Sequence, residues 1–266
     1  MPRQITSFSN ATIKRVRGLA QKKNRIAEGL FMAEGLRICT EALEAGHVPR
    51  VMIFAEGDRH ELTLRLIDET EASGGEALAV SRDILAKVSG KDNPQGVVGV
   101  FDLLDTSLSR LDPAAAAIWI VCESLKDPGN LGTILRTADA VAAGGVILLD
   151  QSCDPFSVEA VRASMGALFT TPIAQAAGED FLTWLRTTPA MLVGTSLKTE
   201  QDYQAVAYPR PTFVFMGNEQ SGLPDHYEAA CDALVKMPML GKADSLNVAV
   251  SCAVMLYEVL NQHRHQ

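Results

Sequence analysis

Apolar and polar positions in the first third of the chain follow the periods of short strands and helices. Apolar runs of β-forming residues predict strands, and apolar residues at helical spacing predict helices between them. The predicted elements are a basic helix over 9–26, strands at 30–35, 51–55, 77–80 and 96–101, and helices over 37–46 and 61–73. This order predicts a small α/β domain over 28–102, preceded by a helical N-terminal segment over 1–27.

The second half of the chain repeats the alternation with longer apolar strands. Residues 103–117 contain a proline, polar residues and an alanine run, and we interpret them as a linker. Beyond it we predict strands at 118–122, 145–150, 171–175, 191–196, 212–217 and 232–237, and helices over 130–143, 156–167, 181–188 and 245–261. Apolar strands separated by helices indicate a mostly parallel sheet covered on both faces, here a second domain over 118–266. Ligands bind such sheets beyond the carboxyl ends of the strands.

Composition excludes several classes of protein. The chain has 266 residues, of which 47% are hydrophobic, so it can build two cores and is not disordered. No apolar run reaches the ~20 residues of a membrane helix, and the N-terminus lacks the apolar centre of a signal peptide. These features predict a cytoplasmic protein without a membrane partner. The five cysteines form no CxxC pair and the five histidines have no metal-ligand spacing, so we expect neither disulfides nor a metal.

Charge is distributed unevenly along the chain. The net charge is −8, which taken alone argues against a nucleic-acid partner. Residues 1–27, however, contain seven lysines and arginines and no acidic residue. Two interpretations stay open: a basic arm that binds phosphates, or a solvated surface helix.

The first segment with candidate chemistry is 127–138, where a strand ends and Asp-Pro-Gly opens a helix. Asn130 lies near the predicted helix start, where its side chain would cap backbone N–H groups. Arg136 comes six residues later and faces another side of an ideal helix. If the two serve one site, Asn130 must act from the loop. A capped helix with a surface arginine is the purely structural alternative.

The second segment, 212–224, is an apolar strand that runs into a loop with two glycines and Glu219. Glycines allow a ligand to approach the backbone closely. An ordinary strand–turn–helix explains Pro224 but leaves Gly217, Asn218 and Glu219 unexplained.

The third segment, 237–250, is a loop with Pro and Gly that leads into a helix, for which we predict Asp244 or Ser245 as the cap. The helix is apolar almost all round, which indicates burial in a core or a subunit interface. Asn247 at its start needs hydrogen-bond partners. Capping alone is the alternative role for Ser245 and Asn247.

Together and in this order, the three segments resemble the SpoU/TrmH-type RNA 2′-O-ribose methyltransferases. They fit that family's patterns N-x-G-x-x-x-R-T, G-x-E-x-x-G and P-M-x-G-x-x-x-S-L-N-V, at Asn130–Thr137, Gly217–Gly222 and Pro238–Val248. The resemblance covers roughly residues 118–262. More loosely, FMAEGLRICTEALEAG and NPQGVVGVF in the first half are similar to the family's ribosomal-protein-like substrate-binding domain.

The resemblance implies a fold and a cofactor that periodicity does not reveal. The catalytic domain would contain a deep trefoil knot, which general folding rules treat as essentially absent. S-adenosylmethionine would bind bent in this knot, at Gly217, Met237 and Leu246, with Thr195 near them. No GxGxxG motif follows a strand, which fits this site better than a Rossmann-type site. The enzyme would be a homodimer through its apolar last helix.

The resemblance also implies catalytic residues. In-line methyl transfer needs alignment of hydroxyl, carbon and sulfur, and removal of the hydroxyl proton. Because a guanidinium stays protonated in proteins, we expect Arg136 to position the target phosphate and stabilise the developing alkoxide, while water or phosphate takes the proton. Asn130 and Asn247 would orient the substrate or fix the loops. Glu219 would hold arginine or asparagine side chains, and Ser245 would contact cofactor or substrate.

The predicted substrate is RNA, because only RNA carries the 2′-hydroxyl. A substrate domain ahead of the catalytic one favours rRNA, with tRNA as an alternative. Another alternative is a protein that binds RNA without methylating it. The presence of all five predicted catalytic residues argues against this alternative, because RNA binding alone would not require them. A hydrolase or a nucleotide-binding enzyme is disfavoured because G-x-S-x-G, P-loop and HExxH motifs are absent from the sequence.

Overall fold

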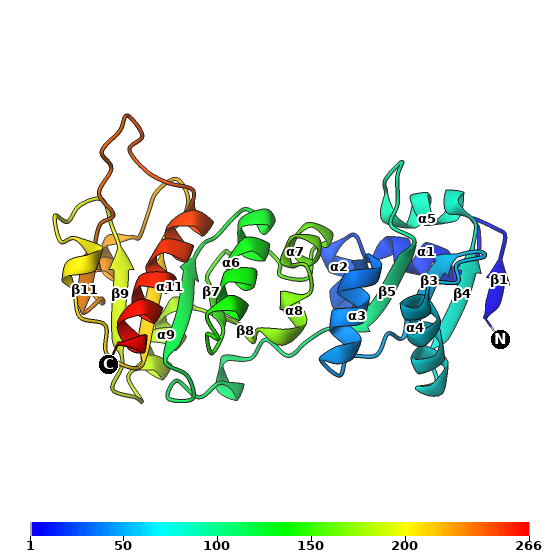
Figure 1. Ribbon diagram of the computed structural model, residues 1–266, viewed down its shortest axis with the longest axis horizontal. Helices are drawn as coiled ribbons and strands as arrows, with labels where there is room; N and C mark the ends of the chain where they lie inside the picture. Colours follow the sequence, from blue (N-terminus) through cyan, green and yellow to red (C-terminus); the bar gives the residue numbers. More distant parts are fainter. Residues whose placement is uncertain (1, 266) are drawn as a thin grey trace. The chain divides into compact units, whose positions relative to one another are not determined.

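The computed structural model describes residues 2–265, so the first residue of the predicted N-terminal segment and the last residue of the predicted catalytic domain lie outside the described residues. The chain divides into two compact units (Figure 1). Unit 1 comprises Met1–Leu104 and Asp154–Thr170, and unit 2 comprises Asp105–Cys153 and Thr171–Gln266. No helix among residues 2–265 is long and apolar enough to cross a membrane.

Unit 1 is built on a mixed sheet of five strands in the order β1-β4-β3-β5-β2. Strands β1, β3 and β4 are parallel, and β5 runs antiparallel to β3 and β2. Its strands are β1 (Arg3–Ile5), β2 (Leu30–Glu34), β3 (Val51–Ala55), β4 (Glu76–Val80) and β5 (Val97–Asp102). Its helices are α1 (Ala11–Gly18), α2 (Lys22–Glu28), α3 (Leu36–Glu44), α4 (Glu61–Ala72), α5 (Arg82–Ser89), α7 (Val158–Ser164) and α8 (Ala167–Thr170).

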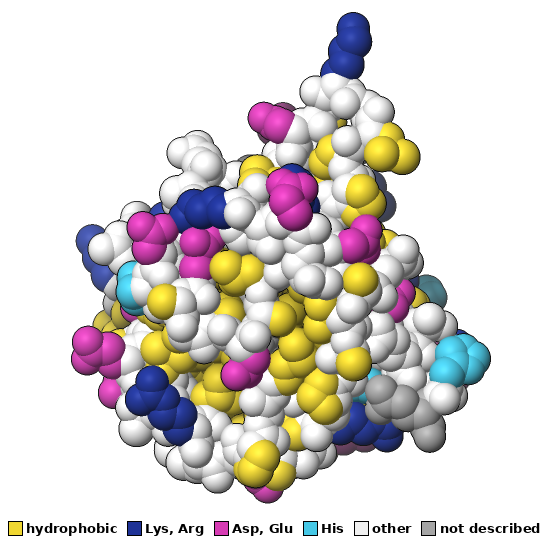
Figure 2. Space-filling view, turned by 90° about the vertical axis from the view of Figure 1, so that its left-hand side faces the viewer, with side chains coloured by type: hydrophobic (Ala, Val, Ile, Leu, Met, Phe, Trp, Pro, Cys, Tyr) yellow, Lys and Arg dark blue, Asp and Glu magenta, His cyan; other side chains and the backbone are white. Residues whose placement is uncertain are grey.

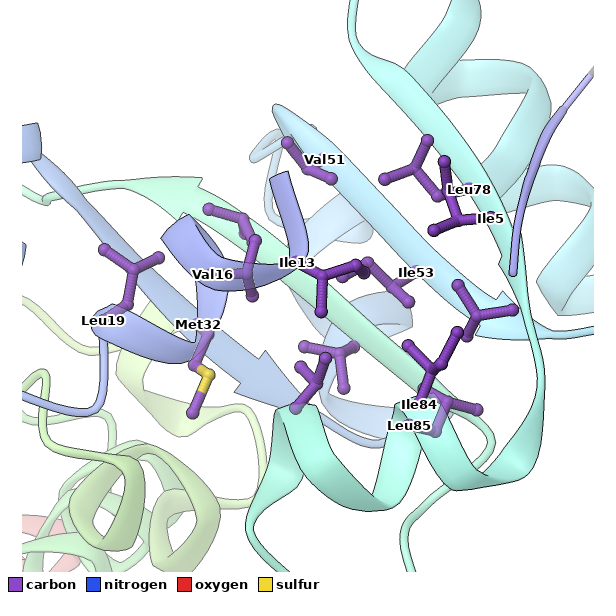
Figure 3. Close-up of a cluster of buried hydrophobic side chains, with 14 of the residues drawn as sticks. Ile5, Ile13, Val16, Leu19, Met32, Val51, Ile53, Leu78, Ile84 and Leu85 are labelled. Atoms are coloured by element: carbon purple, nitrogen blue, oxygen red, sulfur yellow. The ribbon is translucent and has the colours of Figure 1, made fainter. Parts of the chain in front are cut away.

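The core of unit 1 explains why its strands are apolar on both faces. Along β2, Leu30 and Met32 enter the cluster formed with α1 and α5, shown in Figure 3. The residue between them, Phe31, points to the other face because side chains alternate along a strand. There it contacts Phe156 and Phe169, with ring centroids 5.0 and 5.8 Å away.

The N-terminal segment differs from the single basic helix that the pattern predicts. Arg3–Ile5 pairs with β4 as an edge strand, and 9–26 breaks into α1 and α2. The break lies at Leu19, which is buried in the core, and the Asn24 amide donates to the Gly18 carbonyl at 2.8 Å. Residues 3–27 are therefore part of the folded unit. Helix α5 has no counterpart in the prediction, although its Ser81 cap and Gly90 end are recognisable signals.

The segment 154–170 lies in unit 1, whereas the sequence places it inside the catalytic domain as one helix over 156–167. Met165 and Gly166 have positive φ and divide it into α7 and α8. Besides the aromatic contacts to Phe31, the buried Arg25 donates to Asp154 at 2.7 Å. Packing between distant segments, which periodicity does not report, decides this assignment.

Unit 2 is a sheet of six parallel strands in the order β11-β9-β10-β6-β7-β8, which confirms the predicted α/β class with a parallel second sheet. Its strands are β6 (Ile118–Glu123), β7 (Val146–Leu149), β8 (Ile173–Ala176), β9 (Met191–Thr195), β10 (Thr212–Met216) and β11 (Ala233–Val235). Its helices are α6 (Pro128–Ala140), α9 (Gly178–Leu185), α10 (Asp225–Glu228) and α11 (Val248–Arg264), with 3₁₀ turns η1 (Leu108–Arg110) and η2 (Tyr203–Ala205).

The two faces of this sheet are covered by different helices. Trp119, Val121, Phe213 and Phe215 form one core cluster with residues of α9 and α10. Helices α6 and α11 pack against each other, and α11 also contacts β10 and β6. The predicted linker 103–117 is not free: Leu108 and Leu111 pack on the same cluster, and Ser107 bridges to Gln175. Leu108 and Leu111, three positions apart in the sequence, supply the apolar contacts of this attachment.

Candidate active site

The carboxyl ends of β6, β9, β10 and β11 lie at one edge of the parallel sheet, and the loops that follow them enclose two adjoining cavities. The first cavity, of about 420 Å³, is lined by the loops after β9, β10 and β11. The second cavity, of about 650 Å³, is lined by the end of β6, the start of α6, the loop after β10 and the start of α11. The two share a wall that includes Asn218, Glu219 and Leu246.

All four predicted cofactor positions line the first cavity: Thr195, Gly217, Met237 and Leu246. Ser245 lines it as well, and its hydroxyl contacts Asp244 at 3.3 Å. Figure 2 shows a face of unit 2 on which hydrophobic side chains gather in a hollow. The cavity as a whole has both apolar and polar lining, and a concave site of this kind can hold a small organic cofactor.

The second cavity contains a chain of hydrogen bonds that joins the three motifs. The Asn247 amide donates to Asn130 Oδ1 at 2.9 Å, and the Asn130 amide donates to Glu219 Oε1 at 3.3 Å. Each of these side chains comes from a different motif. The fold thus brings three segments that are distant in sequence into direct contact.

Glu219 is the hub of this network. Its carboxylate also accepts hydrogen bonds from the backbone N–H groups of Lys126 and Asp127, at 3.1 to 3.2 Å. Partial burial raises the pKa of this carboxyl, but the backbone N–H donors and Asn130 outweigh it, so the pKa lies below the usual value. Glu219 therefore stays ionised and holds the turn before α6 in place, rather than taking up a proton.

Comparisons with known proteins match both halves of the chain. A model of the SpoU rRNA Methylase family matches residues 117–257. The chain belongs to this family. A model described as the MRM3-like substrate binding domain matches residues 10–99. The predicted resemblance, including that of the first half, is therefore confirmed.

Relatives of this SpoU-family chain cover nearly its full length. The 23S rRNA (uridine(2479)-2′-O)-methyltransferase of Streptomyces viridochromogenes is 31% identical, over 98% of this chain and 92% of that protein. The 23S rRNA (guanosine(2553)-2′-O)-methyltransferase of Bacillus subtilis is 27% identical, over 97% of this chain and 99% of that protein. The crystal structure of an AdoMet-bound rRNA methyltransferase from Sinorhizobium meliloti is 38% identical, with a TM-score of 0.91, over 99% of this chain and 98% of that chain.

Arg136 is the predicted site residue that the structure leaves apart from the others. Helix α6 begins at Pro128, so Asn130 lies in its first turn and not in the preceding loop. Arg136 is then about 9 Å further along the helix axis, at 1.5 Å per residue. It is exposed, lines neither cavity, and makes no hydrogen bond or ion pair with residues 2–265.

Two helix caps differ from the predicted ones. Asp127, and not Asn130, caps α6, because its Oδ1 accepts from the backbone N–H groups of Gly129 and Asn130. Asn247, and not Asp244 or Ser245, caps α11, because its Oδ1 accepts from Ala249 and Val250. The Asn247 side chain therefore caps α11 through its oxygen and donates to Asn130 through its nitrogen. One side chain thus both caps the helix and joins two of the motifs.

The sequence argument singled out Asn218 without giving it a role, and it missed Glu123. Asn218 closes the loop after β10: its Oδ1 accepts from the Gln220 and Ser221 N–H groups, and its amide donates to the Ser124 carbonyl. Glu123, the last residue of β6, lines the second cavity. An acidic residue at the carboxyl end of an apolar strand is a signal that would have identified it. Among residues 2–265, no cluster of His, Cys, Asp and Glu has the arrangement of a metal site.

Replacing Gly217 by alanine should weaken S-adenosylmethionine binding. An added Cβ would lie 2.3 Å from the backbone of Gly222 and Leu223, so the loop along the first cavity must move. Such overpacking costs about 1 to 3 kcal/mol, which corresponds to roughly 5- to 150-fold in affinity. Calorimetric titration of the cofactor measures this. Gly96→Ala is the matched control, because a Cβ there meets its nearest neighbour at 3.9 Å; equal affinities of the two variants would contradict the prediction.

Proposed function

We propose that this chain transfers a methyl group from S-adenosylmethionine to a ribose 2′-hydroxyl of rRNA. The observation that supports this most is the junction of the three family motifs through Asn247, Asn130 and Glu219, at the wall shared by two cavities. One cavity, of about 420 Å³, is lined by the positions predicted for the cofactor, and the other, of about 650 Å³, is lined by Asn130 and Asn247 of the hydrogen-bond network. The relatives named above methylate a uridine and a guanosine, so rRNA is what they share, and the target nucleotide stays open.

The residues of the first cavity fit the cofactor. Gly217 carries no side chain where the backbone of Gly222 and Leu223 approaches, and Met216, Met237 and Val248 supply apolar surface. When bound, S-adenosylmethionine supplies a methyl group already activated by its sulfonium. The chain then aligns the 2′-hydroxyl with that group. In this proposal Asn130 and Asn247 orient the nucleotide, and Glu219 fixes the loop after β10 and the turn before α6. Ser245 contacts the cofactor. Arg136 binds the target phosphate and stabilises the developing alkoxide.

Transfer of labelled methyl groups tests this function directly. The purified chain is incubated with labelled S-adenosylmethionine and either total rRNA or total tRNA, each lacking the modification. We expect label in rRNA. Label in tRNA only would assign the alternative substrate, and cofactor binding without label would point to a ribosomal particle. Absence of cofactor binding would overturn the proposal in favour of RNA binding without catalysis.

We also propose a homodimer through α11. One side of α11 packs on α6 and β10. The burial that the apolar composition of this helix predicts is therefore confirmed for that side only. The other side carries Val250 and Tyr257, 49% and 54% exposed, with Leu246 just before the helix at 42%. Positions 250, 254 and 257 share one face at helical spacing. A second copy of this chain fits such a stripe, and sedimentation as a monomer at micromolar concentration would contradict it.

The N-terminal cations are proposed to bind RNA phosphates. Of the seven, Arg25 is buried and Arg15 pairs with Glu28 at 2.7 Å. Four others on α1 and α2 are exposed and have no acidic partner among residues 2–265: Lys14, Arg17, Lys22 and Lys23. Unpaired cations on adjacent helices form a phosphate-binding face, whereas a merely solvated face of this acidic protein would be expected to carry acids as well.

Replacing these four residues by glutamine should weaken RNA binding and make it less dependent on salt. For every phosphate that a cation no longer neutralises, the slope of log K against log salt falls by about 0.7 to 0.9. Filter binding of rRNA fragments at several salt concentrations measures both quantities. The control replaces four exposed arginines of the same unit, three of them paired with acids: Arg37, Arg50, Arg59 and Arg65. Equal losses in both variants would favour the solvated surface helix.

Two further sequence-based expectations stay predictions. The strand order and the packing of α11 are compatible with the deep trefoil knot that the family resemblance implies. A cytoplasmic location likewise stays a prediction.

A further inference from the structure

Glu123 is a buried carboxylate at the edge of the second cavity. It is the last residue of β6 and is 7% exposed. Side chains alternate along the strand, so it lies on the same face as Trp119 and Val121, above their apolar cluster. It lines the second cavity together with Asn130 and Asn247.

No hydrogen bond or ion pair joins the Glu123 side chain to any part of the chain that the structure describes. Tyr227 is electrostatically coupled to Glu123, but its hydroxyl donates to Asp150 Oδ2 at 2.5 Å and so is not available. The carboxylate oxygens of Glu123 are not among the fully buried side-chain atoms that lack a partner, which among residues 2–265 are the Nε atoms of Arg25 and Arg162, so these oxygens open onto the second cavity. No contact within the described part of the chain accounts for a carboxylate at this position.

The other two carboxylates of the second cavity are already engaged. Glu219 accepts from Lys126, Asp127 and Asn130. Asp127 caps α6 through Gly129 and Asn130. Glu123 is thus the acidic residue of this cavity, within residues 2–265, whose acceptor capacity is unused. An ionised carboxylate only accepts hydrogen bonds, so its partner must be an N–H or O–H group.

We propose that Glu123 accepts a hydrogen bond from the target nucleotide bound in the second cavity. This inference rests on the proposed function and adds a substrate-contacting residue to it. Two donors of a nucleotide have the required chemistry: the ribose 2′-hydroxyl and an N–H on the Watson–Crick edge of the base. The first would make Glu123 a residue of the reacting centre, and the second would make it a determinant of which base is methylated.

The test is Glu123→Gln, which keeps the size of the side chain and removes its charge. Loss of a hydrogen bond to a charged group is expected to lower kcat/KM for RNA by about 10- to 100-fold. The cofactor dissociation constant should not change, because Glu123 does not line the first cavity. The unfolding midpoint should stay the same or rise. The matched control is Glu179→Gln, an exposed acid of α9 outside both cavities.

A second substrate separates the two donors, once the methylated nucleotide is located. It carries a methyl group on the Watson–Crick N–H of the target base. If this RNA lowers the rate of the wild type but not further that of Glu123→Gln, the base donates. The 2′-hydroxyl donates if two results are found together. The variant has a lower kcat with unchanged RNA affinity, and its rate falls by the same factor on the unmodified RNA and on the RNA with the methylated base.

The outcomes that overturn the proposal are distinct from failure of the proposed function. An active wild type with an equally active Glu123→Gln overturns the role of Glu123 alone. A lowered unfolding midpoint in the variant also overturns it, because the carboxylate would then have a structural partner. A wild type that methylates no RNA overturns the proposed function, and this inference with it.

Discussion

Replacing Arg136 by alanine should lower the rate of methyl transfer to RNA by about 10²- to 10³-fold, the loss that follows removal of one group stabilising developing charge. Arg136 is exposed on α6, in the same helix as Asn130, and has no partner among residues 2–265. Its charge is therefore available to the substrate phosphate. Because it lines neither cavity, the affinity for S-adenosylmethionine should stay within about twofold of the wild type.

Single-turnover kinetics with saturating cofactor measures this effect. Arg136→Lys keeps the charge but loses the planar fork that binds phosphate through two hydrogen bonds, so it should also be impaired. Near-normal turnover of the lysine variant would rule out this geometric role. Arg186→Ala is the matched control: Arg186 is an exposed arginine of the same unit that also lines neither cavity but lies outside the three motifs, so the variant should behave as the wild type.

Replacing Asp154 by alanine should destabilise unit 1 by about 3 to 5 kcal/mol, because it leaves a buried charge unpaired. The Arg25 side chain is 4% exposed and that of Asp154 is 15% exposed, with 2.7 Å between Nη2 and Oδ2. Arg25 also donates to the carbonyls of Leu19 and Ala20, so it has no route to solvent without opening the turn between α1 and α2. Asp154→Asn, which keeps a side-chain oxygen that can accept from the Phe156 N–H, should lose less.

Hydrogen exchange of the β2 and β4 amides reports on unit 1, and tryptophan fluorescence reports on unit 2, where both tryptophans lie. The matched control is Asp102→Ala, which breaks an exposed pair with Arg50, also 2.7 Å long, and should cost at most about 1 kcal/mol. Equal protection of β2 and β4 in the Asp154 and Asp102 variants would contradict the prediction.

The positions that the sequence predicts for the cofactor lie in short motifs that follow strands. Thr195, Gly217 and Met237 each lie at or within two residues of the carboxyl end of β9, β10 or β11. Parallel strands carry such positions to one edge of a sheet, whatever the order of the strands. Thus all four positions predicted for the cofactor line one cavity, although the strand order cannot be read from the sequence.

The helix starts were less predictable, because several polar residues compete for each cap. Asp127 and Asn130 are both good capping residues, as are Ser245 and Asn247. Asp127 and Asn247 act as the caps. The Asn130 side chain instead forms hydrogen bonds with Glu219 and Asn247. That contact depends on the packing of α6 against α11, so local propensity does not reveal it.

The sequence by itself determined the class of the fold, the family and the residues of the three motifs, because apolar period and motif spacing are local properties of the chain. Only the tertiary structure decided that 154–170 belongs to unit 1, that Glu219 is the hub that joins Asn130 to the turn before α6, that Arg136 lies apart from both cavities, and that Glu123 is buried without a partner among residues 2–265. These features arise from contacts between residues far apart in sequence, and their free energies depend on burial and geometry that no local pattern encodes.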